Sequence, residues 1–138
     1  MKIKLATGIL ALLVIAMVAC QNQDELEFKR YYTSGMVIYQ SKCQNCHDAQ
    51  GGGLSSLIPP LTDAEYLKAN KHNLACFIKY GQKGLVTING KTFNGQMPAH
   101  DLPAVEIAEV LTYINNSFGN KLGVVTTNEV DEDLKACK

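Results

Sequence analysis

Apolar residues recur along much of the chain at the spacing of amphipathic helices. In residues 32–43 they stand at i, i+4, i+7 and i+11, which predicts a helix with one buried face. Thr33 or Ser34 is the expected N-cap of this helix. Residues 107–114 repeat the pattern at i, i+3, i+4 and i+7 and predict another amphipathic helix, with Asp101 as its expected cap.

Capping residues and glycines predict three shorter helices. A capping box at residues 62–65 opens a helix that extends to about Ala69. Asn73 is placed to cap a second helix that Gly81 ends. A second capping box at residues 126–129 opens a short final helix with apolar residues on one face.

Two stretches depart from the helical pattern. Residues 86–93 form two short runs of strand-type residues joined by Asn89-Gly90, which is typical of a β-hairpin with a type I′ turn. The hairpin is too small for a sheet domain, so we expect it to be a local excursion on an α fold. Three glycines at residues 51–53 predict a loop that ends at Pro59-Pro60.

The first 20 residues have the layout of an export signal. Lys2 and Lys4 precede an apolar run over residues 5–19, which is short for a membrane-spanning helix, although an uncleaved anchor is the alternative. Residues 17–20 resemble the lipobox of bacterial lipoproteins, with Met17 where Leu is usual. This resemblance implies that Cys20 is lipidated and becomes the mature N-terminus.

Length and charge limit the remaining possibilities. The chain has 138 residues and no formal net charge, which predicts one domain and no nucleic-acid partner. We therefore expect a signal peptide at 1–19, a lipidated Cys and polar tether at 20–32, and one domain at 33–138. Five cysteines behind an export signal indicate an oxidising location, facing the periplasm or the cell surface of a bacterium.

The main chemical signal is a Cys-x-x-Cys-His motif at Cys43, Cys46 and His47. In this motif two thiols add to the two vinyl groups of one haem, and the adjacent imidazole binds the iron. A zinc knuckle would need a second pair of ligands, and a thioredoxin-type site would need a flanking strand and helix. We therefore expect one covalently bound haem c.

Together with Gly35 and Tyr39, this motif resembles the N-terminal helix of a class I cytochrome c. The resemblance covers most of the chain from about Thr33 onward. It implies an all-α class I cytochrome c fold, in which the N- and C-terminal helices cross and short helices surround the haem. Some bacterial members of the family also have a small hairpin before the loop of the axial Met.

The same resemblance implies roles for four further residues. A carbonyl in the Pro-containing loop of the family accepts a hydrogen bond from the haem-binding His, and we assign this role to Pro59. Leu61 is expected to pack against the haem. Val110 and Tyr113 are expected to pack over the glycine of the first helix.

Met97 is the expected sixth ligand of the iron. It lies in a loop next to Pro98, whereas core methionines usually lie on helix faces, and the Met-Pro pair resembles the ligand loop of class I cytochromes c. His47 and Met97 are thus the expected metal ligands. The alternatives are His100 in place of Met97, or an open position on the iron.

Cys76 and Cys137 remain after the haem and lipid are assigned, and in an oxidising compartment we expect them to form a disulfide. The alternative is two separate buried thiols. His72 stands in a polar junction and is expected to be a solvated loop residue. Four lysines flank the haem motif or the Met loop and either rim the haem edge or are ordinary solvated side chains: Lys42, Lys79, Lys83 and Lys91.

With both axial positions filled by protein, the iron has no vacant site for a substrate, and the expected function is one-electron transfer without enzyme activity. The expected partners are a dehydrogenase as donor and a terminal oxidase or reductase as acceptor. One alternative is a haem subunit of a dehydrogenase or oxidase complex. The other is a haem enzyme or gas sensor in which the sixth ligand dissociates.

Overall fold

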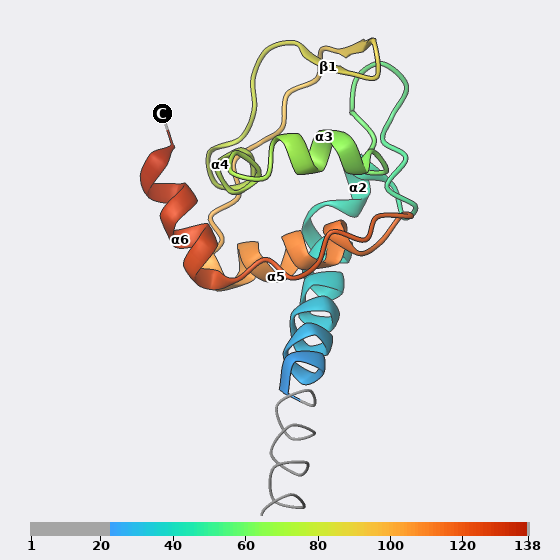
Figure 1. The fold of residues 1–138 in the computed structure, drawn as a ribbon. Coiled ribbons are helices and arrows are strands. Elements are labelled where there is room, and N and C mark those ends of the chain that lie inside the picture. The colour runs from blue at the N-terminus through green and yellow to red at the C-terminus, as the bar shows by residue number, and fades with distance from the viewer. Residues whose placement is uncertain (1–22, 138) are drawn as a thin grey trace, which may run out of the picture. The chain divides into compact units, whose positions relative to one another are not determined.

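A computed structural model describes residues 23–137 of the chain (Figure 1). The signal peptide and the lipidated Cys20 expected from the sequence lie outside these residues. The chain divides into two compact units, residues 1–30 and 31–138.

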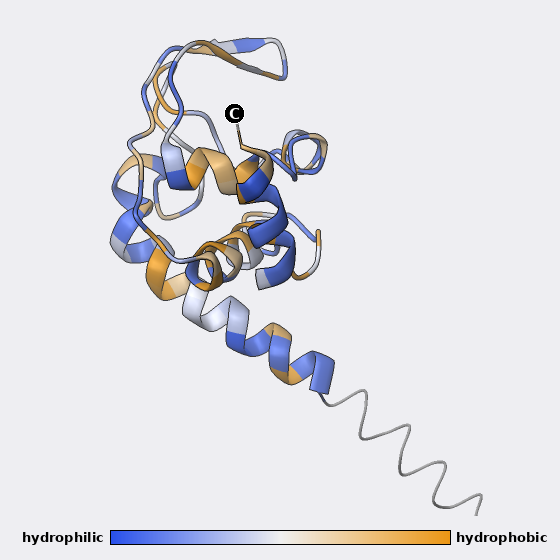
Figure 2. Cartoon of the chain, turned by 90° about the vertical axis from the view of Figure 1, so that its left-hand side faces the viewer, coloured by the Kyte–Doolittle hydropathy of each residue, from blue (hydrophilic) through white to orange (hydrophobic). Residues whose placement is uncertain are grey.

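Residues 23–42 are helical, with 23–30 in the first unit and 31–42 in the second. The first part is mostly exposed and mostly hydrophilic (Figure 2). Thr33 and Ser34 therefore lie within a helix and do not cap it, which corrects the cap expected from the sequence. The helical residues 31–42 are called the N-terminal helix below.

The second unit is built from helices and one hairpin, as the sequence predicts. Its helices after the N-terminal helix are α2 (Gln44–His47), α3 (Ala64–Ala69), α4 (Leu74–Tyr80), α5 (Ala104–Asn115) and α6 (Thr127–Ala136). Strands β1 (Val86–Ile88) and β2 (Lys91–Phe93) pair antiparallel, with Thr87 opposite Thr92. Asn89 and Gly90 both have positive φ, as a type I′ turn requires.

The N-terminal helix and α5 cross at Gly35 (Figure 1). A Cβ at Gly35 would collide with the backbone of Glu109 and would lie 2.9 Å from the Cβ of Tyr113. Tyr39 is 1% exposed, and its ring centroid lies 5.3 Å from that of Tyr113. The expected contact with Tyr113 is confirmed, while the residue nearest to Gly35 is Glu109 and Val110 is part of the buried core.

Two helix caps differ from those expected. α3 is capped by Asp63, whose carboxylate accepts a hydrogen bond from the backbone N–H of Tyr66, so Thr62 does not open a capping box. α5 has Pro103 at its N-cap. Asp101 instead accepts a hydrogen bond from the Lys79 ammonium at 2.7 Å, which holds the pKa of that carboxyl below its usual range.

α6 begins at a capping box and is joined to the rest of the second unit by a core residue and a disulfide. Thr126 and Glu129 form the expected capping box, and Val130 is fully buried. Cys76 in α4 and Cys137 at the end of α6 are joined by a disulfide with a Cα–Cα distance of 5.7 Å. The C-terminal segment is therefore fixed to α4.

Candidate functional site

A large, mostly apolar cavity lies within the second unit. It contains about 1200 Å³ of space, counted out to its open mouth. α2, α4, α5, the hairpin and the loops after α2 and before α5 all contribute to its wall. All six residues expected to contact haem line this cavity, namely Cys43, Cys46, His47, Pro59, Leu61 and Met97.

His47 is buried and held in one orientation. Its Nδ1 lies 3.2 Å from the carbonyl oxygen of Pro59, which has no proton to give, so Nδ1–H is the donor. This tautomer leaves the lone pair on Nε2. Burial lowers the pKa of His47, and the positive charge of His100 lowers it further. The hydrogen bond to Pro59 raises this pKa, but by less than burial lowers it. The neutral imidazole is therefore favoured, which is the form that binds metals.

Cys43 and Cys46 stand one turn apart at the start of α2, and both sulfurs are free thiols in the described part of the chain. Cys43 is half-buried, whereas Cys46 is exposed. Burial raises the pKa of the Cys43 thiol to about 11, and the nearby Cys46 adds to this shift. Two unpaired thiols beside a buried imidazole match what covalent attachment of haem needs.

The loop after α2 brings Pro59 to His47. Gly53 donates a backbone hydrogen bond to the carbonyl of His47 at 3.0 Å, and Leu61 donates one to Gly51 at 2.7 Å. Asn120 is 3% exposed, and its amide donates to the carbonyl of Leu61 at 2.8 Å. The segment that carries Pro59 and Leu61 is thus fixed at both ends.

Met97 and His100 both line the cavity, so both of the sixth ligands considered from the sequence lie at the same site. Met97 pairs with Gln82 through two backbone hydrogen bonds, of 3.0 and 2.9 Å. His100 donates a backbone hydrogen bond to the carbonyl of Ile78 at 2.9 Å. The segment that carries both candidate ligands is therefore attached to the end of α4.

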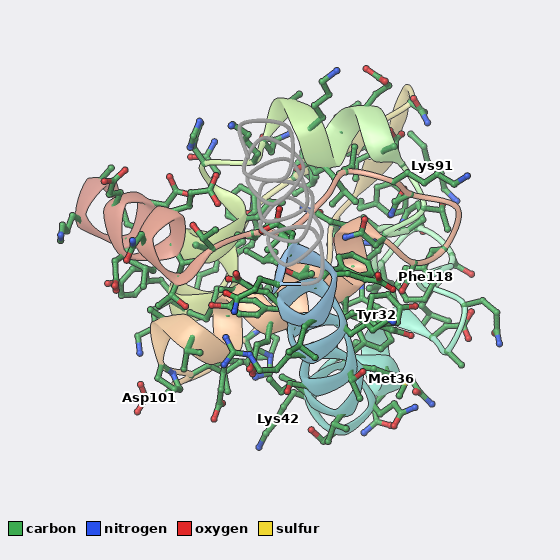
Figure 3. All side chains as sticks on the ribbon, turned by 60° about the horizontal axis from the view of Figure 1, so that its bottom comes forward. Tyr32, Met36, Lys42, Lys91, Asp101 and Phe118 are labelled. Carbon is green, nitrogen blue, oxygen red and sulfur yellow. A yellow bond between two sulfur atoms is a disulfide. The ribbon has the colours of Figure 1, made fainter. Side chains whose placement is uncertain are left out.

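The four lysines considered from the sequence differ in their surroundings. Lys42 lines the cavity. Lys79 is bonded to Asp101 and to the carbonyl of Leu102, and the Lys91 ammonium lies 5.3 Å from the centre of the Phe93 ring. Figure 3 shows Lys42, Lys91 and Asp101 at the periphery of the molecule. Lys83 is exposed and does not line the cavity.

His72 is not part of the cavity. Its side chain is 70% exposed, and its Nδ1 is 2.9 Å from a carboxylate oxygen of Asp133 in α6. This agrees with the solvated position expected from the sequence.

An aromatic cluster lies where the N-terminal helix meets α5, outside the residues that line the cavity. The rings of Tyr39, Tyr113 and Phe118 have centroids between 5.2 and 5.7 Å apart. Tyr32, labelled in Figure 3, joins them through Tyr113 at 5.1 Å. The Tyr39 hydroxyl donates a hydrogen bond to the carbonyl of Asp48 at 2.6 Å, next to His47. This cluster connects the helix crossing to Asp48, the residue after the Cys-x-x-Cys-His motif.

Sequence reasoning missed several residues that support the site. Gly53, Gly81 and Gln82 lie against the segments of Pro59 and Met97, and Asn120 holds Leu61. The glycines were visible as turn signals, but nothing in the sequence said what they approach. Asn120 lies outside any recognisable motif.

The donors around the cavity fit a covalently bound haem. A buried imidazole offers Nε2, two free thiols lie beside it, and Met97 offers a thioether. Apolar side chains make up most of the remaining wall, as a porphyrin ring requires.

Comparisons with known proteins agree with this arrangement. A family model described as "Cytochrome c" matches residues 32–118, which is more than half of the chain. Cytochrome c-552 of Thermus thermophilus is 33% identical over 91 residues, which cover 62% of this chain and 69% of that protein. A second cytochrome c-552 of T. thermophilus has the same identity to this chain, and the matched region is 61% of that protein.

A longer protein also matches. The cytochrome c subunit of the quinone alcohol dehydrogenase of Gluconacetobacter polyoxogenes is 33% identical over 100 residues. These residues cover 70% of this chain but 21% of that subunit. The chain thus corresponds to about one fifth of the subunit's length.

The helices of the second unit are short. Within residues 23–137, no helix is both long and apolar enough to cross a membrane.

Proposed function

The chain belongs to the cytochrome c family and carries covalently attached haem c, and from this premise we propose that it is a single-haem carrier of electrons between redox proteins. Its helices and small hairpin form a class I cytochrome c fold. In the proposal, Cys43 and Cys46 would hold the haem, and His47 and Met97 would bind its iron.

The observation that carries this proposal is that His47 and Met97 line one apolar cavity. When bound, haem c supplies a one-electron couple between ferric and ferrous iron. His47 offers Nε2 to the iron, and its hydrogen bond to Pro59 fixes the direction of the ring. Met97 offers a soft thioether, which favours the ferrous state relative to a second imidazole.

The cavity wall has a second task, which is to keep water away from the iron. Leu61, Leu67 and Phe77 are among its apolar residues, and we propose that Leu61 packs against the haem. A dry site with two protein ligands changes its charge with little rearrangement. This arrangement favours electron transfer over binding and conversion of a substrate at the iron, so we propose that the protein is not an enzyme.

The proposal is tested by rapid mixing of the purified haem protein with small outer-sphere oxidants and reductants. The expected result is rapid, complete oxidation and reduction of the haem. Hydrogen peroxide and nitrite should be turned over no faster than by free haem. Turnover of either substrate well above that of free haem would show that the protein is an enzyme and would contradict the proposal.

A haem subunit of a larger complex is the second candidate function. It is favoured by the match to the cytochrome c subunit of a quinone alcohol dehydrogenase, in which the matched region is a small part of the subunit. Purification from native membranes in mild detergent separates the two candidates. Stable co-purification with a dehydrogenase or oxidase favours the subunit. If the protein instead purifies without partner proteins and its haem is reduced by an added dehydrogenase, the carrier is favoured.

We further propose that the mature protein is a lipoprotein held on an outer face of a bacterial membrane through Cys20. More than one acyl chain is needed for stable anchoring, and a lipoprotein Cys carries that many. Mass spectrometry of the protein from its native host should find a chain that begins at Cys20 with added acyl mass. A soluble, unmodified mature chain would contradict the proposal.

A further inference from the structure

The end of α4 is bonded to the segment that carries Met97. The backbone N–H of Gln82 donates to the carbonyl of Met97 at 3.0 Å, and the N–H of Met97 donates to the carbonyl of Gln82 at 2.9 Å. Both backbone polar groups of Met97 are therefore held by one residue of the turn after α4. The position from which the Met97 side chain enters the cavity is fixed by this pair.

Gly81 allows the two segments to come this close. It ends α4 with φ of +78°, and a Cβ built on it would lie 2.6 Å from the carbonyl oxygen of Met97 and 2.9 Å from the nitrogen of Ala99. Non-bonded atoms do not approach a Cβ this closely without displacement. Any side chain at position 81 must therefore push away the segment of Met97.

α4 also holds the far end of the same segment. The carbonyl of Ile78 accepts the N–H of His100, and the ammonium of Lys79 donates to the carbonyl of Leu102 at 3.0 Å. Residues 97–102 are thus attached to α4 at several points. α4 is in turn tied to α6 by the Cys76–Cys137 disulfide, so it is a rigid support for the segment.

We propose that Gly81 and Gln82 are positioning residues for Met97, which keep its thioether within reach of the iron. This inference rests on the proposed role of Met97 as the sixth ligand. Met97 and His100 lie three residues apart and line the same cavity. The points at which residues 97–102 are attached to α4 therefore determine whether Met97 or His100 faces the iron. The backbone pairing of Met97 with Gln82 places Met97 there.

The test compares two glycine substitutions in the full-length ferric protein with its haem attached. Gly81→Ala adds a methyl group against Met97. Gly84→Ala is the matched control, because Gly84 also has positive φ, +99°, but a Cβ there has no atom within 4 Å. The two variants share the backbone strain of an alanine at positive φ, and they differ in the collision with the segment of Met97.

Two measurements report on the bond between the iron and the Met97 sulfur, and a change in stability alone would not alter them. The first is the weak band at the red end of the spectrum that a thioether on ferric iron gives, and the second is the rate at which added imidazole displaces the thioether. In Gly81→Ala we expect the band to weaken and imidazole to bind about tenfold faster, because strain in the state with the thioether bound lowers the barrier to dissociation of the thioether. Gly84→Ala should match the unmodified protein in both readouts.

Equal band intensities and equal imidazole rates in the two variants would overturn the inference. If the unmodified ferric protein has no such band, Met97 is not the ligand, and the ligand assignment itself fails.

Hydrogen exchange tests the same coupling without a substitution at position 81. If the pair of Gln82 and Met97 positions the thioether, saturating imidazole should speed exchange of both amides, because coupling between two events is reciprocal. The amide of Val130, which is bonded to the carbonyl of Thr126 at the start of α6 and does not line the cavity, is the internal reference. Unchanged exchange at residues 82 and 97 would contradict the inference even if Gly81→Ala does not fold.

Discussion

The Nδ1 atom of His47 lies 3.2 Å from the carbonyl oxygen of Pro59, and Gly53 is packed directly against that carbonyl. Gly53 has φ of +70°, and a Cβ built on it would lie 2.7 Å from the Pro59 oxygen and would collide with the carbonyl of Ile58. The hydrogen bond that orients the imidazole therefore depends on a glycine in a different turn of the loop.

Gly53→Ala is predicted to raise the reduction potential. The added methyl group displaces the carbonyl of Pro59, which weakens the hydrogen bond to His47 and makes the imidazole a poorer donor to ferric iron. Gly119→Ala is the matched control, because Gly119 has φ of +92° and no atom near an added Cβ. Redox titration should find a shift for Gly53→Ala alone, and equal potentials in both variants would refute the role of this contact.

Gly35→Ala is predicted to destabilise the fold, although Ala is normally the better helix residue by about 1 kcal/mol. The new methyl group would strike the backbone of Glu109, where α5 crosses the N-terminal helix. The expected loss is about 3 kcal/mol in the free energy of unfolding, as for an overpacked core. Ser34→Ala, on the same turn, should have little effect in the same denaturant titration. A Gly35→Ala variant as stable as the unmodified protein would mean that the helices do not cross here.

The disulfide between Cys76 and Cys137 is predicted to leave no reactive thiol at either position. It closes a loop with a sequence separation of 61 residues, for which the chain-entropy model gives about 4 kcal/mol of stabilisation. Cys76→Ser with Cys137→Ser should therefore unfold at lower denaturant concentration with unchanged haem content. Thiol titration of the denatured, unreduced haem protein checks the bond itself, and free sulfhydryls at residues 76 and 137 would contradict it.

Met97→Ala is predicted to remove the thioether band of the ferric protein and to lower the reduction potential, because a soft thioether favours ferrous iron. His100→Ala should keep the band, since His100 is not the proposed ligand. Absorption spectra and redox titrations of the two variants decide between these side chains. If His100→Ala loses the band and Met97→Ala keeps it, the ligand assignment is wrong.

Much of this fold could be predicted because the signals are local. The hairpin follows from Asn89-Gly90 alone, and the capping box of α6 follows from Thr126 and Glu129. The helix crossing was predictable because a glycine inside a helix is costly and needs a packing reason, which is the contact of Gly35 with α5.

The errors arose where distant residues compete for a local group. Asp101 stands in a good position to cap α5, but it pairs with Lys79, which is 22 residues away in α4. Thr33 and Ser34 are favoured caps, yet the helix passes through them because residues 23–32 also adopt helical structure.

The residues that support the site were missed for a related reason. Gly53 and Gly81 indicate turns in the sequence, but their approach to Pro59 and Met97 is visible only in three dimensions.

The central claim is that the protein itself fills both axial positions of the haem iron, so that electron transfer is the work left to the iron. Exposure of the reduced protein to carbon monoxide at neutral pH tests it most directly, because carbon monoxide binds ferrous haem wherever an axial position is open or labile. The absorption spectrum should remain unchanged, whereas Met97→Ala should form the complex. Formation of a carbon monoxide complex by the unmodified protein would contradict the claim.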